Sequence, residues 1–164
     1  MPRRREVKNP KSCHERALGL LAVRPRSRRE LERRLLSARF EPDEVQDVLT
    51  RLERVGLVDD EAFARQYAEQ RFGARKEGSR GVERGLRAAG IAPALAATTA
   101  SEGAPDDDEE RAADLALSRA SRLRGVAPQK AFTRLSSLLM RRGYSPETAR
   151  SAARKALEIS LEED

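Results

Sequence analysis

The sequence predicts an all-α protein, built as an elongated tandem array of three-helix, helix-turn-helix-like repeats. Ala, Leu, Arg and Glu dominate the 164 residues, and all four are strong helix formers. Runs of the β-branched and aromatic residues that favour strands do not occur. Charged residues make up 37% of the chain and aromatic residues only 4%. This composition favours several small cores over one deep core.

The repeat becomes visible when the chain is aligned on Pro42, Pro93 and Pro146. Two residues before each proline stands a large apolar side chain: Phe40, Ile91 and Tyr144. Three residues before stand Arg39, Gly90 and Gly143. Seven residues before stand Leu35, Leu86 and Leu139, and eleven residues before stand Leu31, Val82 and Leu135. The last two positions are one helical turn apart and share a face. Each copy therefore reads as an apolar-faced helix, a tight turn and a proline-started helix, and a preceding helix completes the three.

Capping signals set the first helix boundaries. Residues 1–14 are basic and lack an apolar signal core, so we expect a disordered arm. This arm is expected to merge into a helix over residues 12–23. The next helix opens at Ser27, where Glu30 completes a capping-box pattern. Its expected apolar stripe is Leu31, Leu35 and Leu36.

Two more helices are predicted before residue 73. The first runs from Pro42 to a left-handed glycine cap at Gly56. The second starts at Asp59 and Asp60, whose carboxylates suit the positive end of a helix dipole. Its core side chains are expected to be Phe63, Ala64, Tyr67 and Phe72.

The second half of the chain contains the weakest helical pattern. A Gly- and charge-rich stretch leads into a helix over residues 82–91. Residues 92–110 hold no basic residue and include the best candidate linker, residues 103–105, so we expect a flexible joint between 93 and 110. Later helices are expected to begin in the acidic run 106–110, at Gln129 and at Pro146. The repeats would then span residues 15–58, 59–104 and 105–164.

The charge pattern points to a polymeric partner. The net charge is +6, the sequence pI is about 10.1, and 28 of the 33 basic residues are Arg. Arginine suits phosphate and carboxylate recognition because its planar fork binds bidentately, although a GC-rich genome would produce the same bias. Net charge alternates: +9 over residues 1–40, −5 over 41–60, +3 over 61–92, −6 over 93–110, +9 over 111–157 and −4 over 158–164. Such patches favour a groove that presents both protein and phosphate over bare DNA.

The sequence offers little for catalysis, and we expect neither an enzyme nor a bound metal or cofactor. The single His14 is adjacent to the single Cys13, and neighbouring helical residues do not face each other. Phosphate-binding loops, dinucleotide fingerprints, nucleophile elbows and zinc-ligand clusters do not occur. The acidic runs read as helix caps rather than metal ligands. Without an apolar run long enough for a membrane span, a cytoplasmic monomer is expected.

Two modes of nucleic-acid binding can be weighed from the residues. All six aromatic residues fall at core or turn positions, which disfavours base stacking. Three-helix modules are the architecture of helix-turn-helix readers. However, the proline-started helices open with Asp43 and Glu44, with Ala94, or with Glu147, which argues against reading of base edges. Helix-turn-helix-type nucleic-acid binding stays as an alternative function.

Four segments carry a family resemblance. They are, in order, RSRRELERRLL, VLTRLERVGLVDDEAFARQYAEQR, GVERGLRAAGI and KAFTRLSSLLMRRGYSPETARSAARKAL. Together they closely resemble the signatures of the RecX family, regulators of the RecA recombinase, over residues 15–158. Two departures stand out: Arg39 occupies a turn position where the family usually has Gly, and residues 94–110 are atypically rich in Ala.

The resemblance implies a curved repeat protein that binds in the groove of the RecA–DNA filament and bridges neighbouring subunits. Such proteins block filament growth or promote disassembly. Strand exchange, ATP hydrolysis and co-protease activity fall as a result, which damps the SOS response and regulates DNA repair. The expected partner is the RecA filament, with single- or double-stranded DNA as a further candidate. Capping of filament ends and binding along the groove both stay open.

Arginine-rich helix faces are the candidate binding surfaces. They are Arg28, Arg29, Arg33 and Arg34 in the first repeat; Arg71, Arg75, Lys76, Arg80, Arg84 and Arg87 around the second; and Arg141, Arg142, Arg150 and Arg154 in the third. A single arginine of this kind is more often part of a solvated helix face, so the hypothesis concerns patches. Reversal of Arg80, Arg84 and Arg87 to Glu is expected to weaken filament inhibition and to leave helicity intact.

Overall fold

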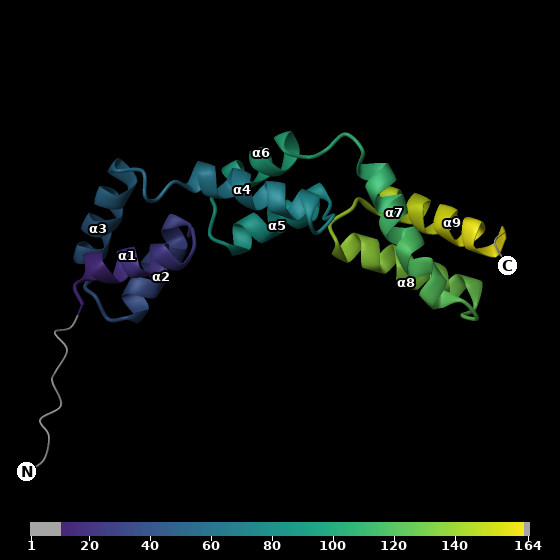
Figure 1. Cartoon of the computed structure of the whole chain (residues 1–164), viewed down its shortest axis with the longest axis horizontal. Coiled ribbons are helices and arrows are strands. Elements are labelled where there is room, and N and C mark those ends of the chain that lie inside the picture. Colours follow the sequence, from purple (N-terminus) through teal and green to yellow (C-terminus); the bar gives the residue numbers. More distant parts are fainter. Residues whose placement is uncertain (1–10, 163–164) are drawn as a thin grey trace, which may run out of the picture. The chain divides into compact units, whose positions relative to one another are not determined.

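The computed structural model describes residues 11–162, and within that range all regular structure is helical (Figure 1). The α-helices are α1 Cys13–Val23, α2 Arg28–Ser37, α3 Pro42–Arg54, α4 Asp60–Gly73, α5 Ser79–Ala88, α6 Pro93–Glu102, α7 Asp108–Ala120, α8 Pro128–Arg141 and α9 Pro146–Glu162. A short 3-10 helix, Ser121–Leu123, extends α7. The predicted all-α class is confirmed. None of the described helices combines the length and apolar character needed to cross a membrane.

The three turns aligned by sequence share one backbone conformation. Arg39, Gly90 and Gly143 have φ values of 68°, 93° and 92°, in the left-handed region. The residue after each donates its backbone N–H to a leucine carbonyl at the end of the preceding helix, with distances of 3.4, 3.0 and 3.2 Å to Leu35, Leu86 and Leu139. This is the Schellman pattern of a helix C-terminus. The helices α3, α6 and α9 then begin at the three aligned prolines, so the predicted repeat of helix, turn and proline is confirmed.

The chain divides into two compact units between Phe63 and Ala64. In the first unit, α1, α2 and α3 pack on one another. Their core consists of Cys13, Ala17, Leu31, Leu35, Val45, Val48, Leu49, Leu52 and Val58. The expected inclusion of Leu36 in this core is wrong, because its side chain lies about 100° around the helix from Leu35. Leu36 is 40% exposed.

The helix expected over residues 12–23 is confirmed as α1, Cys13–Val23. Ser12 caps α1, and its hydroxyl and backbone form a reciprocal capping box with Glu15. The expectation of a disordered arm is therefore wrong for Cys13 and His14, which belong to α1. The part of the expected arm that covers residues 1–10 lies outside the described residues. The division into repeats at residues 15–58, 59–104 and 105–164 stays a prediction.

Two of the predicted helix caps are confirmed. The Ser27 hydroxyl accepts the Glu30 N–H at 3.1 Å, and Asp59 Oδ1 accepts the Ala62 N–H at 2.9 Å. Asp60 has a different role, because its Oδ1 accepts the backbone N–H of Arg28 at 2.8 Å. That N–H lies in the first turn of α2, so the carboxylate stabilises the positive end of this helix.

In the second unit, α7, α8 and α9 form a three-helix core and α5 packs against α6 (Figure 1). The largest buried side chains of the α7–α9 core are Leu115, Leu135, Leu139 and Tyr144. Most of the remaining core positions are alanines on α7 and α9. Small side chains let the axes of these two helices approach closely, which explains how a sequence with few aromatics still packs tightly.

The joint expected between residues 93 and 110 is not where the chain divides. This segment lies inside the second unit, and α6 forms over the weakest helical pattern of the sequence. Its buried residues are Ala96, Thr99 and Ala100, so the face it buries is small rather than strongly apolar. The N–H of Gly103 closes the helix on the Thr99 carbonyl at 3.0 Å. The chain therefore does not divide here, and residues 103–107 form the non-helical connection between α6 and α7. A flexible joint in this segment stays a prediction.

Candidate nucleic-acid and filament interface

Two segments far apart in sequence meet through glycines in the second unit. The start of α5 lies against the turn between α8 and α9, where the Gly78 N–H donates to the Arg142 carbonyl at 2.9 Å. A Cβ atom on Gly81 would lie 2.7 Å from that same carbonyl oxygen, and one on Gly143 would lie 2.0 Å from the Gly81 nitrogen. No side chain fits between these backbones. The contact therefore joins the second and third copies of the sequence repeat directly.

Side chains from both copies hold this junction together. The Tyr144 hydroxyl donates to the Lys76 carbonyl at 2.7 Å. Arg142 Nη1 donates to the Arg75 carbonyl at 2.9 Å, and Arg84 Nη2 donates to the Arg141 carbonyl at 3.0 Å. Burial raises the pKa of the Tyr144 hydroxyl, so it keeps its proton and acts as a donor at neutral pH.

Arg111, which the sequence hypothesis missed, anchors the connection ahead of α5. Its guanidinium is buried and donates to the carbonyl of Phe72 and, at 3.2 Å, to that of Glu77. The same group lies 5.7 Å from the centre of the Phe72 ring and 3.2 Å from the Asp108 carboxylate. No local pattern predicts this role, because Phe72 and Glu77 lie 39 and 34 residues away in the sequence.

The junction gathers candidate arginines that the sequence placed in two separate repeats. We call Arg75, Arg80, Arg84, Arg141 and Arg142 the junction patch. Among the described residues, none of these five side chains pairs with a carboxylate, and the contacts that join them use backbone carbonyls instead. Four of the five are exposed, and Arg142 is partly buried. The patch therefore keeps five full positive charges, the arrangement that binds polyanions.

Several other candidates have their charge compensated within the chain. Arg71 pairs with Glu77 at 2.8 Å and lies over the Tyr67 ring, and Arg87 pairs with Glu83 at 2.7 Å. In the second unit Lys76 also pairs with Asp114, at 3.6 Å, and in the first unit Arg28 pairs with Glu53, at 3.0 Å. These four residues contribute less net charge to a binding surface than the sequence hypothesis assigned them.

The remaining exposed candidates occur in pairs along single helices. Arg29 and Arg33 lie one turn apart on α2, and Arg150 and Arg154 lie one turn apart on α9. Residues at this spacing share a helix face. Within the described range, no ion pair engages any of these four side chains. They are available to an external partner on each unit separately.

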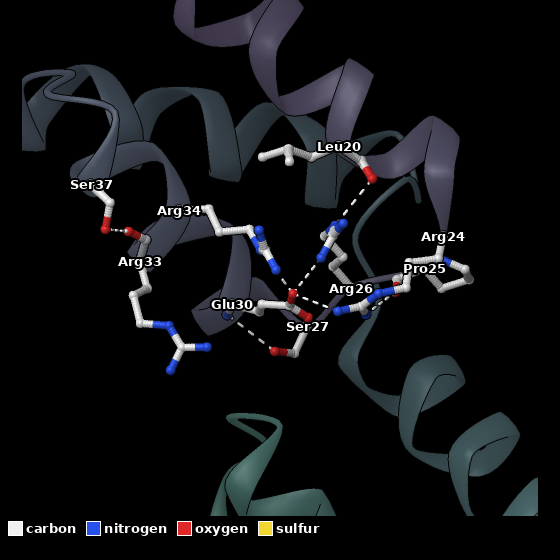
Figure 2. A network of polar contacts seen from close by, with 9 residues as sticks. All are labelled: Leu20, Arg24, Pro25, Arg26, Ser27, Glu30, Arg33, Arg34 and Ser37. Atoms are coloured by element: carbon white, nitrogen blue, oxygen red, sulfur yellow. Dashed lines mark hydrogen bonds and ion pairs between the residues drawn. The ribbon is translucent and has the colours of Figure 1, made fainter.

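Figure 2 shows a polar cluster in the first unit that sequence reasoning did not predict. Arg24, Arg26 and Arg34 all direct their guanidinium groups at the carboxylate of Glu30. Glu30 and Arg26 are buried, whereas Arg24 and Arg34 are about half exposed. Burial raises the pKa of Glu30, but the hydrogen bonds from Arg34, Arg24 and Arg26 outweigh it and hold that pKa below its usual value.

Cys13 and His14, which were considered for catalysis, lie in different environments. Cys13 is fully buried, where burial raises the pKa of its thiol, and the neighbouring His14 is exposed. Over residues 11–158, no group of three His, Cys, Asp or Glu side chains is placed to hold a metal ion. All six aromatic side chains are buried or partly buried, which disfavours base stacking as a mode of binding.

A groove of about 580 Å³ lies between α7 and α9. Its polar lining includes Glu109, Glu110 and Asp114 from α7 and Lys155 from α9. None of the candidate arginines lines it. The groove is therefore separate from the basic surfaces described above.

Repeated three-helix units with one shared turn geometry, and with arginines exposed on their surfaces, define a tandem helical-repeat protein with basic surface patches. Comparison with known families agrees. A family model described as "RecX, first three-helix domain" matches residues 13–52, and one described as "RecX, second three-helix domain" matches residues 59–99. The chain belongs to the RecX family.

Individual relatives and structures lead to the same family. A protein named "Regulatory protein RecX" from Streptomyces coelicolor is 36% identical to this chain, and the match covers 86% of the chain and 75% of the relative. A protein of the same name from Corynebacterium efficiens is 34% identical, with 97% of the chain and 79% of the relative covered. The crystal structure of RecX from Lactobacillus salivarius superposes with a TM-score of 0.76 at 20% identity, covering 90% of this chain and 95% of that one. A second, "Crystal structure of regulatory protein RecX", gives 0.74 at 21% identity, covering 89% and 70%. At these identities the two structures establish the fold.

Proposed function

We propose that this protein binds the RecA–DNA filament and inhibits the recombinase, ATPase and co-protease activities of RecA, as a non-catalytic regulator of DNA repair and the SOS response. Membership of the RecX family supports the assignment, since the sequence resemblance implies RecA as the partner of such proteins. The observation that carries it is the junction patch. Five uncompensated arginines from two repeats meet around a glycine contact, and a filament offers phosphate and protein carboxylates to such a surface.

Co-sedimentation with preformed RecA–DNA filaments tests this proposal against helix-turn-helix-type binding of nucleic acid without RecA. The protein is expected to bind filaments more tightly than the same DNA without RecA at equal salt. A protein that binds only DNA would lose affinity by about 0.9 log unit per phosphate contact per log unit of salt. If naked duplex competes fully for the protein, the RecA proposal fails and the alternative holds.

Paired variants locate the surface. Arg80→Glu combined with Arg141→Glu reverses two exposed charges of the junction patch, neither of which holds another side chain in the described structure. Arg122→Glu with Arg134→Glu makes the same charge change at two exposed positions outside the patch. Only the patch variant is expected to lose filament binding, with unchanged helicity in both.

A further inference from the structure

The arginine cluster around Glu30 contains more positive charge than its own stability requires. Arg26 and Glu30 form a buried ion pair, and Arg26 Nε also donates to the Leu20 carbonyl at 3.0 Å. This pair is electrically neutral and anchors the end of α1 to α2. Two additional guanidinium groups, from Arg24 and Arg34, approach the same carboxylate oxygen at 2.7 and 3.0 Å. The cluster contains no second carboxylate that would balance these two positive charges.

The two additional arginines are exposed and keep free donors. The side chains of Arg24 and Arg34 are 48% and 47% exposed. Arg34 uses only Nε for Glu30, so both of its Nη groups have no hydrogen-bond partner among the described residues. Arg24 uses Nη2 for Glu30 and Nη1 for the Pro25 carbonyl, which leaves Nε. Both guanidinium groups contact one oxygen atom, at 2.7 and 3.0 Å, so their contacting nitrogens lie within about 6 Å of each other, a span that one phosphate group can bridge.

We propose that Arg24 and Arg34 form a phosphate-binding site for the nucleic-acid backbone and that Glu30 is its positioning residue. Glu30 fixes two long side chains before the ligand arrives, which lowers the conformational entropy lost on binding. A phosphodiester also relieves the repulsion between the two guanidinium groups. Arg29 and Arg33 lie on the same helix and are exposed, and the Arg33 side chain points away from the cluster (Figure 2). They extend the positive surface for neighbouring phosphates.

A phosphate ligand fits this site better than a protein carboxylate. The cluster lies in a stretch, residues 24–34, that contains six arginines and two glutamates, and a nucleic-acid strand supplies anions at a regular spacing to such a row. The site deepens the proposed function, because it names the ligand of the first unit. It is tested on DNA without RecA, so its failure and the failure of the RecA proposal are separate results.

Fluorescence anisotropy with a labelled single-stranded oligonucleotide provides the test, using the full chain. Arg24→Lys and Arg34→Lys keep the charge but remove the planar fork, and each is expected to weaken binding at least threefold. Arg51→Lys, an exposed arginine on α3, is the matched control and should bind as the parent does. Arg24→Ala with Arg34→Ala should reduce the slope of log affinity against log salt by about 0.7, the value for one phosphate on single-stranded DNA.

Glu30→Gln separates positioning from simple charge. The substitution raises the net charge by one, so a carboxylate that only cancelled charge would yield tighter DNA binding when removed. If Glu30 positions the two arginines, Glu30→Gln should bind DNA more weakly than the parent. Glu30→Asp, which keeps the carboxylate, should then recover part of the lost affinity. Circular dichroism checks that each variant is folded. If Glu30→Gln does not fold, the lysine variants decide: DNA affinity and salt slope equal to those of the Arg51 control would overturn the site.

Discussion

The hydroxyl of Tyr144 donates a 2.7 Å hydrogen bond to the backbone carbonyl of Lys76, which is 68 residues away in the sequence. Lys76 has a left-handed backbone with φ of 47°, a conformation that costs free energy for a non-glycine residue. The tyrosine contact helps to hold that conformation. The same stretch of chain, residues 75–78, also accepts a bond from Arg142 and donates one to its carbonyl.

Tyr144→Phe therefore tests how strongly this bond supports the second unit. Loss of one partly buried hydrogen bond is expected to lower the free energy of unfolding by about 1 kcal/mol. Urea denaturation followed by circular dichroism measures the change. Thr133→Val is the matched control: it also removes one hydroxyl, but that hydroxyl bonds locally within α8 at an exposed position, so a change within about 0.5 kcal/mol is expected. Equal effects of the two variants would contradict the role assigned to Tyr144.

The glycine contact at the junction predicts a sharp difference between two alanine substitutions. Gly143 and Gly125 have similar positive φ values, 92° and 78°, so alanine is strained to a similar degree at both, by about 1–2 kcal/mol. A Cβ on Gly125 meets no atom within 4 Å, whereas a Cβ on Gly143 would lie 2.3 Å from the Gly81 Cα. Gly143→Ala is expected to cost at least 2 kcal/mol more than Gly125→Ala. Thermal unfolding of both proteins measures this, and equal losses would show that the backbones are not in contact.

The sequence predicted the repeat well because its signals are local. Each copy ends a helix with a buried leucine, a left-handed residue and a proline start, and these features depend on neighbours only a few residues away. Arg39 satisfies the same left-handed position as Gly90 and Gly143, so the turn geometry is kept although the residue type departs from the pattern. Helix α6 was difficult to predict because its buried face is made of Ala and Thr.

The candidate site could be predicted only in part. Sequence reasoning found the arginines, but for several of them the contacts that decide whether they are free or engaged span tens of residues. Arg28 meets Glu53, and Arg142 meets the Arg75 carbonyl, and neither contact leaves a local signal. Ser27 and Glu30 matched a capping box, and the hydroxyl bond was confirmed. The additional role of the Glu30 carboxylate, which contacts three arginines, required the structure.

Stability of the first unit is expected to depend on pH through Glu30. Its pKa is lower in the folded protein than in the unfolded chain, where an ordinary Glu titrates at about 4.3. The ion pairs therefore contribute fully above the unfolded pKa, and their contribution is lost as the pH falls through the lower, folded pKa. Urea midpoints of the parent and of Glu30→Gln, measured from pH 7 to pH 3, should differ most at pH 7 and converge in acid. A difference that stays constant over this range would contradict the assignment.

We propose above that this chain inhibits RecA on DNA through its arginine surfaces. The most direct measurement is a titration of the DNA-dependent ATPase activity of RecA with this protein at substoichiometric ratios. We predict that ATP hydrolysis falls well below the RecA-alone rate, and that combined reversal of Arg80, Arg84 and Arg87 to Glu weakens this inhibition while circular dichroism shows unchanged helicity. ATP hydrolysis that stays at the RecA-alone rate up to equimolar protein would contradict the claim.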